Sequence, residues 1–532
     1  MKKTHLLVLA ILFSNILFAQ VFTSSNLPIV VINTNNLQIP DEPKITVTMG
    51  IIYNGPGVRN NTTDPFNNYN GKIGIELRGN YSQTFPQKCF SIETRDALDS
   101  AQDVSLLNMP AENDWILYAP YSDKSLLRNV TTFKIASEIG NYAVRSVFCE
   151  LILNGSYQGI YVLMEKIKRG ANRVRISKLD FDDNSGDSLT GGYIFKQDWG
   201  AGVQHGGWNS QYNGISFQYH YPYTPTVQQK NYIKLFVDSF ENALNGVNFA
   251  DPLIGYKKYI DVTTFIDFII MNEFTKNWDG YVASNFFHKE KITDGGKIKA
   301  GPIWDYNISF GNLDWCAMHD TTGWIYPVNF CRAKMDWFEI LMQDTNFVNK
   351  LKCRWDWVRY KNIPNGYLNN YLDSMTTYLN ESQQRHFIKW PLLGTNVISE
   401  PQPLETTFQG EINYMKRWLN GRLNWIDNNM PGTCYNVSVD DGNAIANDAY
   451  ISTYPNPFDN KLTVNYFLNE TTEVQIQLVN SLGQIIKTMD CGTKTAGDYN
   501  QSLTNFDNLP SGVYMLRVLT ATKAYNKTVI KY

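Results

Sequence analysis

Apolar and polar residues alternate in several short segments of this chain, and a period of two residues predicts β-strands. Residues 71–77 place Ile73, Ile75 and Leu77 on one face. Residues 157–166 are apolar on both faces, which is typical of a central strand. The same pattern predicts further strands over residues 27–32, 44–53, 87–92, 148–153 and 191–196.

A period of three to four residues predicts helices over residues 122–140, 228–244 and 261–276. The first should begin at Ser122 or Asp123 as the N-cap and end at Gly140. Residues 315–429 are expected to be mostly helical, with their many tryptophans in the core rather than on a ligand platform.

The segment that follows the helix 261–276 predicts a β-hairpin. Its strands are expected over residues 285–290 and 297–304, around a turn at 294–296 that contains two glycines. With that turn at the tip, Asn285 would lie roughly opposite Trp304 and Asp305, and Asp279 is one short loop away. Two carboxylates and a carboxamide would therefore meet at one end of the hairpin.

This grouping suits phosphoryl transfer, which needs a carboxylate to orient the attacking hydroxyl and oxygen ligands for Mg²⁺. Asp279, Asn285 and Asp305 follow the order in which protein kinases place these groups. Two alternatives are open. The residues could be ordinary turn and capping residues of a surface hairpin, or Asp279 and Asp305 could be the acid pair of a glycosidase.

Lys88 has the same strand parity as Phe90 and Ile92, which places it on an inward face. A buried charge needs an anionic partner, and either Glu165, at the end of the central strand, or a phosphate would serve. The alternative is that Lys88 extends to solvent from the start of the strand.

Residues 1–20 have the features of an export signal, with Lys2 and Lys3 before a short apolar run. No later apolar run is long enough to predict a transmembrane segment. The net charge of -3 argues against a nucleic-acid partner, which would require a basic face. Seven cysteines in 532 residues match neither a disulfide framework nor a zinc site, although Cys316 and Cys331 could pair in an oxidising compartment.

Residues 431–450 are polar and predict a linker, and the alternation in residues 451–532 predicts a small β-sandwich. The motifs there are YPNPF at 454–458, SLG at 481–483, SGVY at 511–514 and the ending KTVIKY. With these motifs the segment resembles the type A sorting domain of the type IX secretion system. The resemblance implies contact with that machinery, and secretion or attachment to the outer-membrane surface.

Residues from about 70 to 370 resemble the spore-coat-protein-H-like (CotH) kinase family, and the kinase-like domain is expected over residues 70–430. The motifs that carry the resemblance are LRGN at 77–80, FPQK at 85–88, LRN at 127–129, LNGSYQGIY at 153–161, MEK at 164–166, GGY at 191–193, NWDGY at 277–281, Asn285-Phe286, Trp304-Asp305 and Phe310-Gly311. The resemblance implies an α+β fold, with an atypical, two-lobed protein-kinase-like core in front of the all-β, immunoglobulin-like C-terminal domain. Residues 21–69 would form an N-terminal β segment.

The resemblance also implies binding of ATP with Mg²⁺ or Mn²⁺ and phosphorylation of Ser or Thr in a protein substrate. It implies Asp279 as the catalytic carboxylate and Asp305 as the metal ligand, with Asn285 as a second ligand. The nucleotide contacts are assigned to Lys88 with Glu165, and to Arg78 and Arg128.

The chain departs from the family at Asn307, where the family usually has a second acid two residues after the metal-binding Asp. Loss of that charge would weaken metal binding, and ATP is scarce outside cells. The alternative to a secreted kinase is therefore a non-catalytic surface or adhesion protein on a kinase-like scaffold.

Overall fold

The computed structural model describes residues 22–212, 214–331, 335–434, 451–468, 471–480, 483–495, 497–521 and 524–532. The expected export signal and most of the expected linker lie outside these residues. The chain divides into two compact units, one ending at Thr433 and the other beginning at Cys434.

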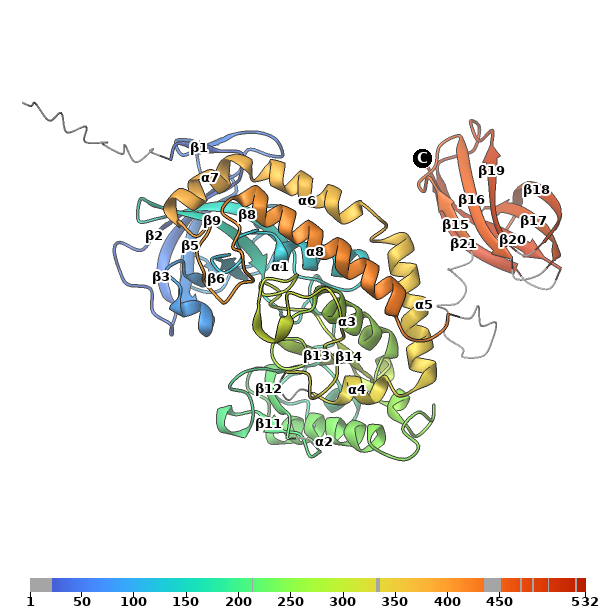
Figure 1. The fold of residues 1–532 in the computed structure, drawn as a ribbon, viewed down its shortest axis with the longest axis horizontal. Coiled ribbons are helices and arrows are strands. Elements are labelled where there is room, and N and C mark those ends of the chain that lie inside the picture. The colour runs from blue at the N-terminus through green and yellow to red at the C-terminus, as the bar shows by residue number, and fades with distance from the viewer. Residues whose placement is uncertain are drawn as a thin grey trace, which may run out of the picture. The chain divides into compact units, whose positions relative to one another are not determined.

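Seven strands of the first unit form a closed barrel in the order β2-β3-β5-β6-β7-β9-β8 (Figure 1). Their bounds are β2 Ile29–Asn33, β3 Ile45–Ile52, β5 Tyr69–Arg78, β6 Cys89–Arg95, β7 Asp114–Tyr118, β8 Ser146–Leu153 and β9 Ser156–Glu165. All neighbouring strands are antiparallel except β2 and β8, whose parallel pairing closes the barrel. Because β2 and β3 belong to this barrel, residues 21–69 are not a separate segment from the rest of the unit.

The two apolar faces of β9 serve two different cores. Tyr161 and Leu163 lie in the hydrophobic cluster inside the barrel. Ile160, Val162 and Met164 lie in the larger cluster that the barrel shares with the helices. The prediction of a central strand over this segment is confirmed, and its reason is that successive side chains of a strand point to opposite faces.

A second sheet has the strand order β11-β12-β10-β13-β14. Its strands are β10 Tyr193–Gln197, β11 Trp208–Asn209, β12 Ser216–Tyr221, β13 Asn285–Lys289 and β14 Ile298–Ala300. The expected hairpin is present as β13 and β14, but its second strand ends at Ala300 because Pro302 has no N–H to continue the ladder. Asn285 therefore pairs with Gln197 of β10 and not with Trp304 or Asp305.

The helices of the first unit are α1 Arg128–Glu138, α2 Val227–Leu244, α3 Val262–Thr275, α4 Trp337–Leu341, α5 Thr345–Lys361, α6 Tyr367–Tyr378, α7 Asn380–Lys389 and α8 Phe408–Asn429. α1 begins six residues later than expected at Ser122, because a turn precedes it in which Leu126 has φ 63°. The N-cap is Leu127 and not Ser122 or Asp123, although the Asp123 carboxylate accepts the N–H of the first helical residue, Arg128, at 2.8 Å.

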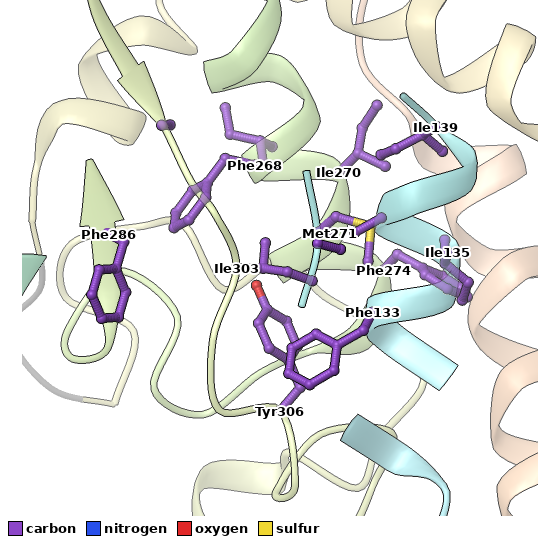
Figure 2. Packing of buried hydrophobic residues seen from close by; sticks show 14 of the residues in the cluster. Phe133, Ile135, Ile139, Phe268, Ile270, Met271, Phe274, Phe286, Ile303 and Tyr306 are labelled. Atoms are coloured by element: carbon purple, nitrogen blue, oxygen red, sulfur yellow. The ribbon is translucent and has the colours of Figure 1, made fainter. Parts of the chain in front are cut away.

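α1 packs against α3, and this contact supports the candidate site. Phe133 and Ile135 of α1 face Met271 and Phe274 of α3, and Tyr306 lies beside them (Figure 2). α3 is capped by Asp261, whose carboxylate accepts the N–H groups of residues 263 and 264. A rigid, buried α3 therefore carries the loop that follows it.

The second unit is all-β. Its strands are β15 Ile451–Tyr454, β16 Lys461–Leu468, β17 Thr472–Val479, β18 Ile485–Lys494, β19 Gly497–Thr504, β20 Gly512–Thr520 and β21 Ala524–Lys531, in sheets β15-β16-β19 and β18-β17-β20-β21. Leu462 and Val464 of one sheet and Ile476 and Leu478 of the other share one buried cluster. The two sheets thus face each other across a core of their own.

Candidate active site

Asp279 lies in a tight loop directly after α3. Its carbonyl accepts the N–H groups of Val282 and Ala283, both at 3.0 Å. A Cβ on Gly280 would approach within 2.9 Å of the Asn272 side-chain oxygen, so only glycine fits there. The loop is therefore closely packed on the last turns of α3.

Asp305 follows β14 and is partly buried. Burial, together with the negative charges of Asp279 and Asp198, raises the pKa of its carboxyl to about 7, although Arg78 opposes the shift. The structure thus brings the carboxylates of Asp279 and Asp305 into one electrostatic cluster, as the hairpin prediction required, although through a shorter hairpin.

Asp198 is a member of this cluster that the sequence analysis missed. It comes directly after β10, and its carboxylate accepts the Ser284 N–H at 3.3 Å and lies 2.6 Å from Lys196 Nζ. Gln197 is paired with Asn285, so the end of β10 meets the start of β13. The signal that could have found it is an acid directly after a strand, but only the β10–β13 pairing places it at the site.

Asn285 is buried and holds the Asp279 loop. In the orientation that satisfies its neighbours, its side-chain oxygen accepts the N–H groups of Val282 at 3.0 Å and Tyr281 at 3.2 Å. The carboxamide of Gln197 lies 2.9 Å away. Because a carboxamide oxygen has two lone pairs, these contacts favour a loop-holding role, and the metal-ligand role stays a prediction.

Five non-glycine residues in the loops around these carboxylates have a positive φ. They are Lys276 at 49°, Tyr281 at 65°, Ser284 at 56°, Asp305 at 64° and Phe310 at 51°. Each such conformation costs on the order of 1 kcal/mol or more and persists only where surrounding contacts impose it. Such residues cluster at functional sites, where the backbone has to hold side chains in a particular orientation. Their concentration in two adjoining loops is typical of such a site.

Arg78 ends β5 and places its guanidinium 5.4 Å from the centre of the Trp304 ring. Burial lowers its pKa, while Cys89 and Asp305 are the leading influences in the other direction. In the part of the chain that the structure describes, no acid lies within ion-pairing distance of this guanidinium. Arg78 is thus a cation at the carboxylate cluster that keeps donors for an anionic ligand.

The expected pairing of Lys88 with Glu165 is wrong. Lys88 Nζ donates to the Gln83 carbonyl at 2.6 Å, because the side chain folds back over the turn before β6. Glu165 is fully buried and is held by Arg145 at 2.6 Å and the Tyr142 hydroxyl at 3.0 Å. The nucleotide contact of Lys88 stays a prediction, but Glu165 is not its partner.

Lys166, the residue after β9, lies close to Arg78. Burial lowers the pKa of its ammonium, as do the positive charges of Lys44, Arg78 and Lys168, against the attraction of Asp114. Its Nζ lies 3.7 Å from the Asp114 carboxylate. Neighbouring residues of a strand point to opposite faces, so Lys166 reaches the Arg78 side while Glu165 points away.

Arg128 is completely buried and has a scaffolding position. Its guanidinium pairs with Asp123 at 2.6 Å and donates to the Ser309 carbonyl at 3.1 Å. Ser309 belongs to the loop after Asp305, so Arg128 supports that loop from α1. These contacts do not support the expected contact of Arg128 with a nucleotide, because its side chain is closed off from solvent.

Asn307 lies partly buried, two residues after Asp305. Its Nδ2 donates to the Ser122 hydroxyl at 3.0 Å, and its carbonyl accepts Asn312 Nδ2 at 2.9 Å. Asn307 is thus part of the hydrogen bonding within the loop.

Cys316 and Cys331 form a disulfide, as the sequence suggested they could. Both residues are exposed. The bridge closes the segment 316–331, which directly follows Trp315. The Trp315 ring lies 5.5 Å from the ring of Trp278, the residue before Asp279.

The described residues contain no group of three His, Cys, Asp or Glu side chains arranged to hold a metal ion by themselves. Proteins commonly bind Mg²⁺ through one or two carboxylates together with the phosphates of the substrate. Asp305 has the chemistry for such a ligand, since a cation would relieve the repulsion among the three carboxylates. Within the same residues, no helix has the length and hydropathy needed to cross a membrane.

Residues 452–532 match the family described as "Secretion system C-terminal sorting domain". This domain directs type IX secretion, so the chain is secreted or attached to the cell surface. The expected sorting function of the C-terminal unit is confirmed.

Among curated proteins, the chain is similar to the inner spore coat protein H of Bacillus subtilis (strain 168), with 21% identity over 241 residues. The match covers 45% of this chain and 59% of that protein, so it spans less than two thirds of the relative. Among solved structures, a Pseudomonas fluorescens alkylpurine DNA glycosylase bound to DNA containing an abasic site analog matches at 12% identity. It covers 39% of this chain and 56% of that one at a TM-score of 0.13, which carries no argument.

The second sheet, nearly all of the helical part and the barrel strands from β6 to β9 fall within one family match. Residues 75–426, which include every carboxylate of the candidate site, match the family described as "CotH kinase protein". This match covers more than half of the chain, and the chain therefore belongs to the CotH kinase protein family.

Proposed function

We propose that this protein is a secreted or surface-attached, Mg²⁺-dependent protein kinase that transfers the γ-phosphate of ATP to Ser or Thr of a protein substrate. The observation that carries the proposal is the meeting of Asp279, Asp305 and Asp198 beside Arg78, which supplies negative charge for a metal and positive charge for phosphate. Membership of the CotH kinase protein family also supports phosphoryl transfer as the reaction class.

In this proposal Asp279 orients the acceptor hydroxyl and accepts its proton. The hydroxyl oxygen forms a bond to the γ-phosphorus, the bond from that phosphorus to the bridging oxygen of ADP breaks, and the proton passes through the Asp279 carboxylate to solvent. Asp305 would hold Mg²⁺, which supplies neutralisation of the phosphate charge. Lys196, which pairs with Asp198 at 2.6 Å, and Arg78, which lies near Asp305, are cations at this position. Lys166 lies near Arg78, and Lys88 directly precedes β6.

Two arrangements help Asp279 in this role. Asn285 fixes the two N–H groups that follow in the loop, and Gly280 lets the loop pack onto Asn272. Reacting groups held in the attacking geometry account for a large part of enzymatic rate enhancement. The barrel would be the nucleotide-binding lobe and the helical part the acceptor-binding lobe of a two-lobed kinase-like core.

A non-catalytic surface or adhesion protein is the second candidate function. The observation in its favour is Asn307, whose carboxamide is engaged with Ser122 where the family usually has a second acid. A scaffold that keeps the loops but has lost metal affinity would bind partners without transferring phosphate.

The test is incubation of the purified protein without its export signal with γ-labelled ATP, in parallel with Mg²⁺, with Mn²⁺ and with chelator. Metal-dependent labelling of the protein itself or of a generic acceptor protein supports the kinase. Calorimetry on the same sample separates the alternatives, because ATP binding without transfer would favour the scaffold function.

A further inference from the structure

One face of α8 forms hydrogen bonds with the end of α3, which precedes the Asp279 loop, and with the chain that follows Asp305. Tyr414, Trp418 and Arg422 are spaced at i, i+4 and i+8, so they project from the same side of the helix. The Tyr414 hydroxyl donates to the Gly311 carbonyl at 2.9 Å, and Trp418 Nε1 donates to the His319 carbonyl at 2.7 Å. α8, orange in Figure 1, thus holds the loop that follows Asp305.

Arg422 connects two segments that are far apart in the sequence. Its Nε and one NH₂ group donate to the Glu273 carbonyl at 2.9 and 2.6 Å. The other NH₂ group donates to the carbonyls of Thr321 and Gly323 at 3.0 and 2.7 Å. The guanidinium is completely buried, and its rigid, planar fork is what allows one side chain to bridge the end of α3 and the segment 321–323.

Glu273 passes this connection on to the Asp279 loop. Its carboxylate accepts the Tyr281 hydroxyl at 3.0 Å and the Ile325 N–H at 2.9 Å, and it lies 3.6 Å from the Arg422 guanidinium. Tyr281 is the second residue after Asp279 and has a φ of 65°. The Tyr281 hydroxyl is therefore held by Glu273. Glu273 is in turn held by Arg422, which also holds the segment 321–323.

The segment that Arg422 grips is closed by the disulfide between Cys316 and Cys331. Lys276, the C-cap of α3, adds a second hold, since its Nζ donates to the carbonyls of Ala317 at 3.1 Å and Asp320 at 3.0 Å. Two buried cations, one from α8 and one from α3, thus fasten the disulfide-closed segment to the helix end from which the Asp279 loop begins.

We propose that Arg422 is a positioning residue for catalysis, which acts through Glu273 and Tyr281 to fix the Asp279 loop against α3 and the disulfide-closed segment. The inference rests on the proposed function of Asp279. Arg422 touches no reacting atom, and its effect on the rate comes from geometry: a displacement of about 1 Å at the reacting groups can cost about 100-fold in rate.

Arg422→Lys is the appropriate variant because it keeps the buried positive charge and loses the fork. Removing the charge altogether would leave Glu273 buried without its cation and endanger the fold. Arg417→Lys is the matched control, since it makes the same exchange on the same helix at an exposed residue whose ion pair with Glu405 lies on the surface and whose cation over the Tyr414 ring is kept by lysine. Tyr281→Phe removes the hydrogen bond from the Tyr281 hydroxyl to Glu273 and keeps the aromatic ring.

Two measurements are made on full-length protein. Hydrogen exchange of the Val282 and Ala283 amides, which donate to Asp279, reports on the loop without any need for activity. It should accelerate at least about tenfold in Arg422→Lys and Tyr281→Phe, with the amides of β5 and β6 unchanged. The kcat for phosphate transfer should fall about tenfold to 100-fold in both variants, while the KM for ATP stays within about threefold.

The double variant distinguishes positioning from general weakening of the fold. If both residues act through one connection, the combined loss in kcat is smaller than the product of the two single losses. Unchanged exchange at Val282 and Ala283 in Arg422→Lys, or losses that multiply fully, would overturn the inference. A wild-type protein that transfers no phosphate would refute the proposed function, and the exchange measurement would still decide whether Arg422 holds the loop.

Discussion

The Tyr306 hydroxyl donates to the Asn272 side-chain oxygen at 2.9 Å, which joins the residue after Asp305 to the helix that carries the Asp279 loop. The same Asn272 oxygen borders Gly280 in that loop. The Phe310 N–H also donates to the Thr275 carbonyl at the end of α3, at 2.8 Å. The two acidic loops are therefore both fastened to one helix, in addition to the hairpin between them.

Asp305→Asn should weaken Mg²⁺-dependent ATP binding at least about tenfold and leave the fold intact. Asparagine keeps the size of the side chain and tolerates the φ of 64° at this position, but it removes the charge that attracts the cation. Calorimetric titration of ATP with and without Mg²⁺ measures the effect. Asp373→Asn, at an exposed acid of α6, is the control, and equal Mg²⁺-dependent binding in both variants would remove Asp305 as the metal ligand.

Asp279→Asn should keep ATP affinity within a few-fold, while the rate of phosphate transfer falls by a factor on the order of 100. The amide retains the shape of the loop but cannot accept the proton of the acceptor hydroxyl. ATP binding and phosphate incorporation are measured on the same preparation. Transfer by this variant at the wild-type rate would show that Asp279 is only a loop residue.

Asn307→Asp should tighten Mg²⁺ binding several-fold, because it restores a negative charge near Asp305. The Ser122 hydroxyl, which now accepts from Asn307 Nδ2, can rotate to donate to the new carboxylate. The concentration of Mg²⁺ that gives half-maximal labelling with ATP is the measurement. A requirement for more Mg²⁺ than the wild type needs would contradict the prediction.

Glu241 should make the protein less stable as pH rises from about 4.5 to about 7. Burial raises the pKa of this carboxyl to about 7, against hydrogen bonds that include one from Trp337 Nε1 at 2.9 Å. A raised pKa means that the folded state favours the protonated form, so the contribution is complete below the unfolded-state pKa and is lost as pH passes the folded-state value. The loss is on the order of 3 kcal/mol.

Glu241→Gln tests this, because its amide is neutral at every pH. The melting temperature of the variant should match that of the wild type near pH 4 and exceed it at pH 8. Parallel melting curves of the two proteins across this range would show that Glu241 is not the titrating group.

Deletion of residues 451–532 should leave a soluble, folded first unit that is no longer secreted. The C-terminal unit has its own core, which includes Leu462 and Ile476, and the hydrophobic clusters of the first unit contain no residue of it. Melting of the purified fragment and its amount in culture medium are the measurements. Normal levels of the truncated protein in the medium would contradict the sorting role.

The order of the motifs along the chain was sufficient to recognise the family. The periodicity of apolar residues was sufficient to predict most of the strands and helices. β9 is central because both of its faces are apolar, and α2 and α3 lie within one residue of their predicted bounds. Asp279 and Asp305 could be proposed because they lie in family motifs that follow the expected helix 261–276 and the expected strand 297–304. These features are local, and local patterns of polarity and turn residues are what a sequence records directly.

What only the tertiary structure decided are the partners that come from distant segments. Asp198 reaches the site through the pairing of β10 with β13, and Glu165 turns to Arg145 instead of Lys88. Arg422, from α8, meets the Glu273 carbonyl across 149 residues of sequence. Buried polar groups take whichever partner the packed chain brings within hydrogen-bonding distance, and that choice is made by the closure of the barrel and the packing of α8, which no local pattern contains.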